Sequence, residues 1–270
     1  MAEAYEVLEK LGEGSFGRVH RGRRRYTGQF CALKFIAKAS KREPDLCALR
    51  TEVGILQRLH HPNIIRLLDL FETAEDIVLV TELASGELFE VLTSDGALTP
   101  EAVASVARDL TSALAYLHEQ RVMHRDLKPQ NCLISSSGVV KLADFGFAAE
   151  LTGRASALLT SVKGTPLYMA PEMFSAAQYQ PSADVWGLGV LLYELAAGRP
   201  PFSASTLPEL MQAIVDPAVP VAYPEGLGRD LRSFLGLCLV REPTARASWA
   251  ALLAHPYLAA PIGAPEGKEE

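Results

Sequence analysis

The chain has 270 residues, 49% of them hydrophobic and 21% charged, with a formal net charge of −6. This balance is typical of a globular protein with a sizeable core, and the negative charge argues against a nucleic-acid partner. The most apolar stretch, residues 185–197, is too short to span a bilayer and contains Glu194, so we expect no membrane span.

The first third of the chain alternates apolar and polar residues between Gly-rich or basic turns, as short strands do. Strands are predicted over residues 5–11, 17–22, 29–36, 64–71 and 77–83. Apolar residues at steps of three and four predict one helix over 44–59, which His61-Pro62-Asn63 ends. The basic run 21–25 is most simply a solvated face, with nucleic-acid contact as the alternative.

After residue 86 the pattern becomes helical. Helices are predicted over 100–118 (capped by Thr99), 182–197, 207–215, 228–239 and 249–255, with one short strand over 139–142. Residues 259–270 are rich in Pro, Gly and acidic side chains, which predicts a disordered tail.

These elements predict a single α+β domain over 1–270 with two lobes. A small antiparallel-sheet lobe with one helix covers about 5–83, a hinge about 82–86, and a larger, mostly helical lobe about 87–258. A cleft between two lobes is a usual ligand site.

Four cysteines occur without a CxxC pair, and no histidine cluster has zinc spacing. They are Cys31, Cys47, Cys132 and Cys238. Three lie among apolar residues, where free thiols behave as small hydrophobic groups. The N-terminus lacks an apolar signal core. We expect a reducing, cytoplasmic compartment.

The first candidate for chemistry is the loop LGEGSFGRV at residues 11–19. Glycines let a backbone approach phosphates without an obstructing Cβ. An isolated GxGxxG is equally an ordinary hairpin turn, or a dinucleotide loop if a helix follows it. Here a strand-like segment follows, which disfavours the dinucleotide reading.

Three further segments carry polar groups next to apolar anchors. Lys34 lies in the strand CALKF and needs an anion, for which Glu52 is the candidate and Glu43 the second choice; an edge-strand surface lysine is the alternative. Asp144 in DFG suits Mg²⁺ but also fits any turn. In HRDLKPQN, Asn131 could equally be a turn residue, and a structural role is favoured for His124.

In order along the chain, the Gly-rich loop, strand Lys, helix Glu, HRDLKPQN, DFG and APE (170–172) resemble the protein-kinase signature set from about residue 5 to 258. The resemblance implies a two-lobed protein-kinase fold and catalysis with ATP and Mg²⁺. It implies that Asp126 orients the substrate hydroxyl, and that Lys128 offsets phosphoryl charge as in serine/threonine kinases. Asn131 and Asp144 would hold Mg²⁺, and Lys34, steadied by Glu52, would bind phosphates.

The same resemblance implies an ATP site and a switch. The ATP-binding residues would be Leu11, Gly12, Glu13, Gly14, Ser15, Phe16, Gly17, Val19, Ala32, Lys34, Thr81, Glu82, Ala84, Glu87 and Leu133. Thr165 would lie in the substrate loop. Ser161, or its neighbour Thr160, would be a regulatory phosphosite for an upstream activating kinase, with Arg125 pairing the phosphate.

Within kinases, the stretches GEGSFGRVHRGRRRYTGQ, ASGELFEVL, DFGFAAEL and LLTSVKGTPLYMAPE resemble the Fused family. Its members are serine/threonine kinases of Hedgehog signalling, motile cilia or plant cytokinesis, which implies a protein substrate and cytoskeletal or ciliary association. Ala143 and Cys132 depart from the family pattern. Autophagy-initiating and mitotic kinases are alternatives, as is a pseudokinase scaffold, although Lys34, Asp126 and Asp144 are all present. A dinucleotide oxidoreductase is a distant third.

Overall fold

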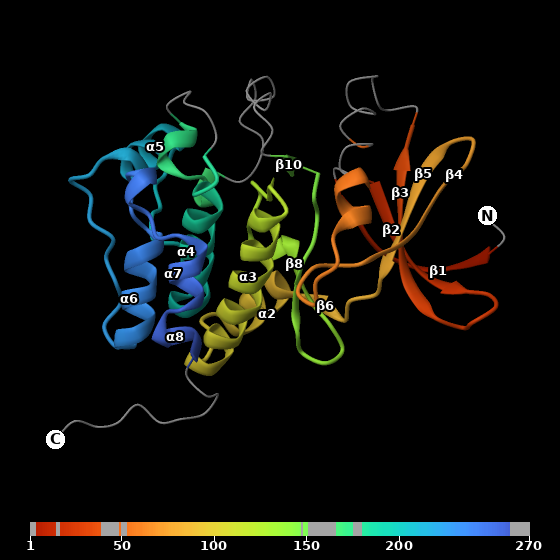
Figure 1. Cartoon of the computed structure of the whole chain (residues 1–270), viewed down its shortest axis with the longest axis horizontal. Helices are drawn as coiled ribbons and strands as arrows, with labels where there is room; N and C mark the ends of the chain where they lie inside the picture. The colour runs from red at the N-terminus through yellow and green to blue at the C-terminus, as the bar shows by residue number, and fades with distance from the viewer. Residues whose placement is uncertain are drawn as a thin grey trace.

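The computed structural model describes residues 4–14, 17–38, 49, 53–146, 148–150, 166–174 and 180–259. At one end lies a five-stranded antiparallel sheet, and at the other a group of helices (Figure 1). The predicted α+β arrangement of two lobes is thereby confirmed. The predicted tail lies almost wholly outside the described residues.

The small lobe is built on strands in the order β1-β2-β3-β5-β4, in which every neighbouring pair is antiparallel. The strands are β1 (Tyr5–Gly14), β2 (Gly17–Arg24), β3 (Phe30–Ala37), β4 (Leu67–Glu72) and β5 (Asp76–Glu82). All five were predicted, with ends that differ by up to three residues. The predicted helix is described at 49 and 53–58, where Leu49, Val53 and Leu56 are buried.

The two faces of this sheet bury different sets of side chains, because successive strand residues point to opposite faces. On β3, Ile36 joins the main core, whereas Cys31 and Leu33 belong to a separate outer cluster. On β5, Leu79 faces the main core and Val80 the outer cluster. The main-core face turns toward the rest of the molecule, and the outer face carries its own small core.

The larger lobe is helical. Its helices are α2 (Leu88–Asp95), α3 (Pro100–Glu119), α4 (Ala183–Ala197), α5 (Leu207–Val215), α6 (Arg229–Cys238), α7 (Trp249–Leu253) and α8 (Pro256–Ala259). Thr99 caps α3 as predicted, since its Oγ1 accepts a hydrogen bond from the Ala102 N–H at 3.3 Å. The most apolar segment is α4, which is buried on almost every side. None of the described helices is long and apolar enough to cross a bilayer.

Short strands lie between the five-stranded sheet and the helices (Figure 1). They are β6 (Gly86–Glu87), β7 (Val122–Met123), β8 (Cys132–Ile134), β9 (Val140–Leu142) and β10 (Ala149–Glu150). β8 pairs with both β6 and β9, and β7 pairs with β10. Of these, only β9 was predicted, as a strand over 139–142; β6, β7 and β10 have two residues each, and β8 has three. Helix α8, of four residues, is about one turn long, and helix α2, of eight residues, was also not predicted.

Candidate active site

A cavity of about 830 Å³ lies between the lobes. Both lobes contribute to its lining. The lining residues are Leu11, Gly12, Glu13, Gly17, Val19, Ala32, Lys34, Leu56, Ile65, Leu79, Thr81, Glu82, Leu83, Ala84, Ser85, Gly86, Glu87, Glu90, Lys128, Gln130, Asn131, Leu133, Ala143, Asp144 and Phe145. Most residues predicted to bind ATP are among them.

Strand register places the upper wall of this cavity. Ala32 pairs with Thr81, and Lys34 with Leu79, so these four residues share one face of the sheet. Val19 on β2 lies opposite Lys34. Leu79 was not predicted from the sequence to line the site. It could have been, because it lies two residues before Thr81 on the same strand and so points to the same face.

At position 17 of the Gly-rich loop, the structure accepts only glycine. Gly17 has φ 130°, and a Cβ built there would lie 2.0 Å from the carbonyl oxygen of Phe35. A side chain is therefore excluded both by conformation and by space. Gly17 also pairs with Gly14 at the end of the β1–β2 ladder.

The connection between the lobes is anchored on both sides by Glu82. Its Oε1 accepts a hydrogen bond from the Arg66 N–H at 2.8 Å and lies 3.0 Å from Lys141 Nζ. The Glu82 N–H donates to the Arg66 carbonyl at 3.0 Å. The backbone predicted to meet adenine thus begins at a fixed point between β4, β5 and β9.

Three side chains of HRDLKPQN converge next to the cavity, and two of them, Lys128 and Asn131, line it. Lys128 Nζ donates to Asp126 Oδ2 at 2.7 Å. Asn131 Nδ2 donates to the same oxygen at 2.9 Å and to the Asp126 carbonyl at 2.7 Å. Asp126 is 7% exposed, so its carboxylate is held by these neighbours more than by water. Proline at the start of the 3-10 turn Pro129–Asn131 fixes the spacing.

A second carboxylate holds the backbone of this loop. Asp184, at the start of α4, accepts hydrogen bonds from the N–H groups of His124 at 2.8 Å and Arg125 at 2.9 Å. Arg125 has φ 67°, which costs a non-glycine residue energy that these bonds offset. His124 is buried, lies 3.0 Å from the Ala143 carbonyl through Nε2, and contacts the Phe145 ring edge. These contacts match the structural role predicted for His124.

Replacing Asp184 by Asn tests this support. We expect Asp184→Asn to lower kcat by about tenfold or more. The neutral amide would no longer accept charge-assisted hydrogen bonds from both backbone N–H groups, including that of Arg125, whose backbone is strained. The KM for ATP should change by less than threefold, since Asp184 does not line the cavity. Steady-state kinetics, with circular dichroism to verify folding, would check this. An unchanged kcat would contradict the positioning role.

Across the cavity lies Asp144, which has φ 59° and whose Oδ1 is 3.4 Å from Lys34 Nζ. Asn131 makes its hydrogen bonds through Nδ2, which leaves Oδ1 for a cation. These two side chains are hard oxygen donors of the kind Mg²⁺ prefers. Within the described residues no three His, Cys, Asp or Glu side chains gather to hold a metal alone. The donor set therefore fits Mg²⁺ whose remaining ligands are phosphate and water oxygens.

The outer mouth of the cavity is acidic. Glu87 precedes α2, and its backbone N–H donates to Glu90 Oε2 at 3.1 Å. Partial burial raises the pKa of Glu87, and the neighbouring charge of Glu90 raises it further. Glu90 was not predicted to line the site. Its spacing of three residues from Glu87 could have indicated it, because side chains one helical turn apart lie close together. Two carboxylates here favour a cationic or hydroxyl-bearing ligand group.

Several predicted residues fall outside what the structure describes. These are Ser15, Phe16, Glu52, Thr160, Ser161 and Thr165, and of Gly14 only the backbone is described. Their roles stay predictions. Lys34 makes a further interaction in addition to its contact with Asp144.

The protein kinase domain family matches residues 5–258 of the chain. The chain belongs to the protein kinase family. The predicted kinase fold and its five-stranded small lobe are confirmed by this match. The motifs at Lys34, Asp126 and Asp144 lie within the matched residues.

Named relatives narrow the class. Serine/threonine-protein kinase TIO of Arabidopsis thaliana is 49% identical over 256 residues, or 95% of this chain and 19% of TIO. Serine/threonine-protein kinase fused of Drosophila melanogaster is 42% identical over 254 residues, or 94% of this chain and 31% of that protein. Myosin light chain kinase A of Dictyostelium discoideum is 37% identical, covering 94% of this chain and 88% of that protein.

These matches identify a protein serine/threonine kinase domain with strong similarity to Fused, as the sequence motifs predicted. The chain spans less than a third of the length of TIO and of fused.

Proposed function

We propose that this chain transfers the γ-phosphoryl group of Mg·ATP to serine and threonine hydroxyls of protein substrates. The observation that carries the proposal is the Asp126 carboxylate, held at 2.7 Å by Lys128 and at 2.9 Å by Asn131. Lys128 and Asn131 line the cavity that also contains Lys34 and Asp144. Phosphoryl transfer needs positioning and charge neutralisation more than covalent chemistry.

Each group has one task in this proposal. Asp126 accepts a hydrogen bond from the substrate hydroxyl and orients its oxygen for attack. Lys128 bonds to Asp126 and lies where negative charge develops, and Lys34 holds the α- and β-phosphates. Mg²⁺ on Asn131 and Asp144 would neutralise phosphate oxygens. The backbone of 12–17 would cover the phosphates, with Leu11, Val19, Ala32 and Leu133 around adenine.

Substrate and context are also proposals. We propose a Fused-type signalling kinase that is cytoplasmic, with cytoskeletal or ciliary association, and a single domain over 1–270. Gln130 lines the cavity beside the acidic mouth of Glu87 and Glu90. A neutral amide there, with carboxylates nearby, favours a modest preference for substrates with an arginine close to the acceptor.

The test is phosphate transfer from labelled Mg·ATP to serine, threonine and tyrosine peptide libraries, with Lys34→Met as the inactive control. Transfer to serine and threonine by the wild type alone supports the proposal. No transfer, even after loop phosphorylation by another kinase, would favour a scaffold. Transfer to tyrosine alone would contradict the assigned class.

Loop phosphorylation gives a separate prediction. Replacing Ser161 and Thr160 together by Ala should lower the activity of the phosphorylated protein by about tenfold or more, because the Arg125 guanidinium loses its phosphate partner. Transfer rates before and after treatment with a phosphatase would measure this. The idea fails if the double variant keeps wild-type activity and is insensitive to the phosphatase.

A further inference from the structure

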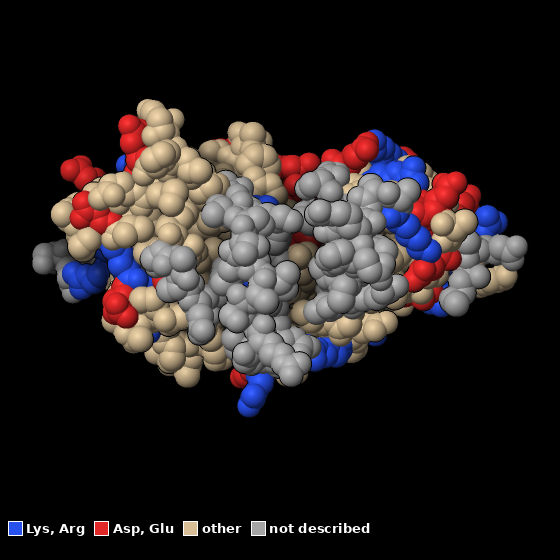
Figure 2. All heavy atoms as spheres, turned by 90° about the horizontal axis from the view of Figure 1, so that it is seen from above, with Lys and Arg blue, Asp and Glu red and all other residues tan. Residues whose placement is uncertain are grey.

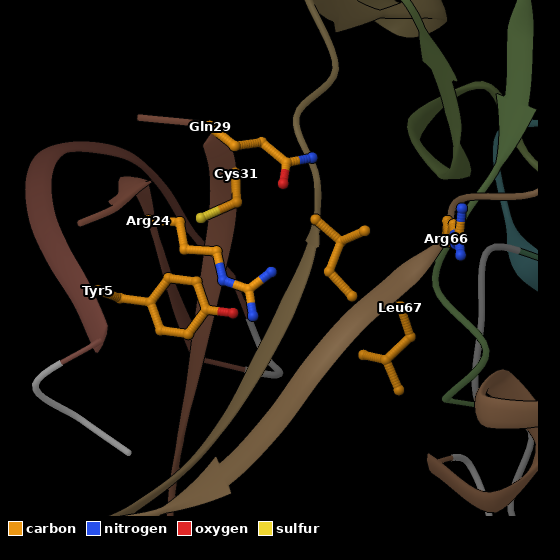
Figure 3. A pocket seen from close by; sticks show the side chains of 7 residues that line it. Tyr5, Arg24, Gln29, Cys31, Arg66 and Leu67 are labelled. Atoms are coloured by element: carbon orange, nitrogen blue, oxygen red, sulfur yellow. The ribbon is translucent and has the colours of Figure 1, made fainter. Parts of the chain in front are cut away.

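A second cavity, of about 280 Å³, lies on the other face of the small-lobe sheet (Figure 3). Cys31 lines it, whereas its neighbour Ala32 lines the cavity between the lobes. Because adjacent strand residues point to opposite faces, the two cavities are separated by the thickness of the sheet. Tyr5 and two leucines complete the floor, and no part of the proposed transfer reaction uses it.

One wall is formed by Arg24, from the basic run noted in the sequence. Two other arginines of that run form ion pairs: Arg21 pairs with Glu9 at 3.0 Å, and Arg23 pairs with Glu6 at 2.7 Å. Figure 2 shows basic and acidic side chains interleaved over this lobe. Arg24 lies on the opposite face and extends past the Tyr5 ring toward the cavity (Figure 3). Among the described residues, nothing forms an ion pair or hydrogen bond with its guanidinium.

A second arginine lines the same cavity. The backbone of Arg66 is fixed by two hydrogen bonds to Glu82, but its guanidinium likewise has no acceptor within the described part of the chain. Gln29 adds an exposed amide to the lining, next to Cys31 (Figure 3). The lining therefore offers two positive charges and several N–H donors, and no described carboxylate forms an ion pair with either guanidinium.

Asp69, beside the cavity floor, already accepts hydrogen bonds from its neighbours. Asp69 accepts a hydrogen bond from the Tyr5 hydroxyl at 3.0 Å and another from the Leu70 N–H at 2.8 Å. Burial, together with the hydrogen bond to Asp69, raises the pKa of Tyr5 to about 12, so the hydroxyl stays a donor. The positive charge of Arg24 acts in the opposite direction on both Tyr5 and Cys31, as expected for a guanidinium close to the cavity floor.

We infer that this cavity is an anion site that takes the phosphoryl group of a phosphorylated serine or threonine in a peptide. Guanidinium groups bind phosphate through paired N–H donors, and two of them match its charge of nearly −2. A carboxylate side chain carries one charge and would leave the second arginine unmatched. The site lies directly behind the hinge residue Glu82, so an occupant there is separated from ATP.

The experiment is a titration of the whole chain followed by ¹⁵N–¹H NMR, with the nucleotide cleft filled by Mg·ADP. The probes are an alanine-flanked phosphoserine peptide, its unphosphorylated and glutamate counterparts, and inorganic phosphate. We expect the phosphoserine peptide to shift the backbone resonances of Arg24 and Arg66. Arg24→Ala and Arg66→Ala should each weaken binding by about tenfold or more, and Arg24→Lys by less.

The matched control is Arg25→Ala, which removes the same charge from an adjacent exposed residue that does not line the cavity. It should change the affinity by less than twofold. Equal losses in Arg25→Ala and Arg24→Ala would show general charge attraction and overturn the site. Loss only in Arg125→Ala would move binding to the catalytic loop and also overturn it. Equal affinity for inorganic phosphate would overturn the assignment to a peptide.

Discussion

Asp126→Asn should lower kcat by about 10²- to 10⁴-fold, the range that one positioned general base contributes. The substitution keeps the shape of the side chain but removes the charge on which Lys128 and Asn131 converge. An amide cannot accept the proton of the substrate hydroxyl. The affinity for ATP should stay within about threefold, because Asp126 is not part of the cavity lining. Steady-state transfer rates and nucleotide titration together would measure both effects.

The double variant Asp126→Asn with Asp144→Asn tests whether the two carboxylates act in the same catalytic step or independently. Groups that act as a unit have effects that do not add, so the double variant should be only slightly slower than the slower single variant. The midpoint of thermal unfolding serves as the control for folding. A kcat near that of the wild type in Asp126→Asn would refute the role given to this carboxylate.

Arg246→Ala should lower the free energy of unfolding by about 3–5 kcal/mol, the usual cost of leaving one member of a buried ion pair alone. The Arg246 side chain is 0% exposed and donates two hydrogen bonds to the Glu172 carboxylate, at 2.7 and 2.6 Å. It also donates to three backbone carbonyls, those of Ser182, Val240 and Arg241. Urea unfolding followed by circular dichroism would measure the loss.

A surface pair supplies the matched control. Arg23 is half-exposed and pairs with Glu6 at 2.7 Å, so Arg23→Ala should cost less than about 1 kcal/mol. The double variant Arg246→Met with Glu172→Leu should be more stable than Arg246→Ala, because it removes the isolated charge as well. The explanation fails if Arg246→Ala costs no more than Arg23→Ala.

Long elements were predictable because their periods are long enough to read. Residues 100–118 and 207–215 repeat apolar side chains at helical spacing, and the structure has helices over Pro100–Glu119 and Leu207–Val215. The five strands of the small lobe alternate clearly between turns. The strand β7 at Val122–Met123 has two residues, and its pairing with β10 depends on a partner more than 25 residues away. No local pattern carries that information.

The polar side chains at the centre of the site could also be predicted from local sequence. Asp126, Lys128 and Asn131 lie within six residues, so a stiff loop must bring them together. The contact between Lys34 and Asp144 joins residues 110 positions apart. The sequence proposed a carboxylate partner for this lysine but could not rank distant ones, because ion pairing depends on distance in space and on burial.

Motifs of fixed spacing were enough to predict which residues handle ATP and the substrate hydroxyl, because they set the donor and acceptor groups. The strained backbone of Arg125, and the choice of which arginines of the run 21–25 form ion pairs, followed only from the packed structure. Alternation places Arg24 on the opposite face from Arg23, but whether a carboxylate faces either one depends on neighbouring strands. Whether an arginine of this run forms an ion pair therefore depends on the packed sheet, because its carboxylate partner comes from another strand.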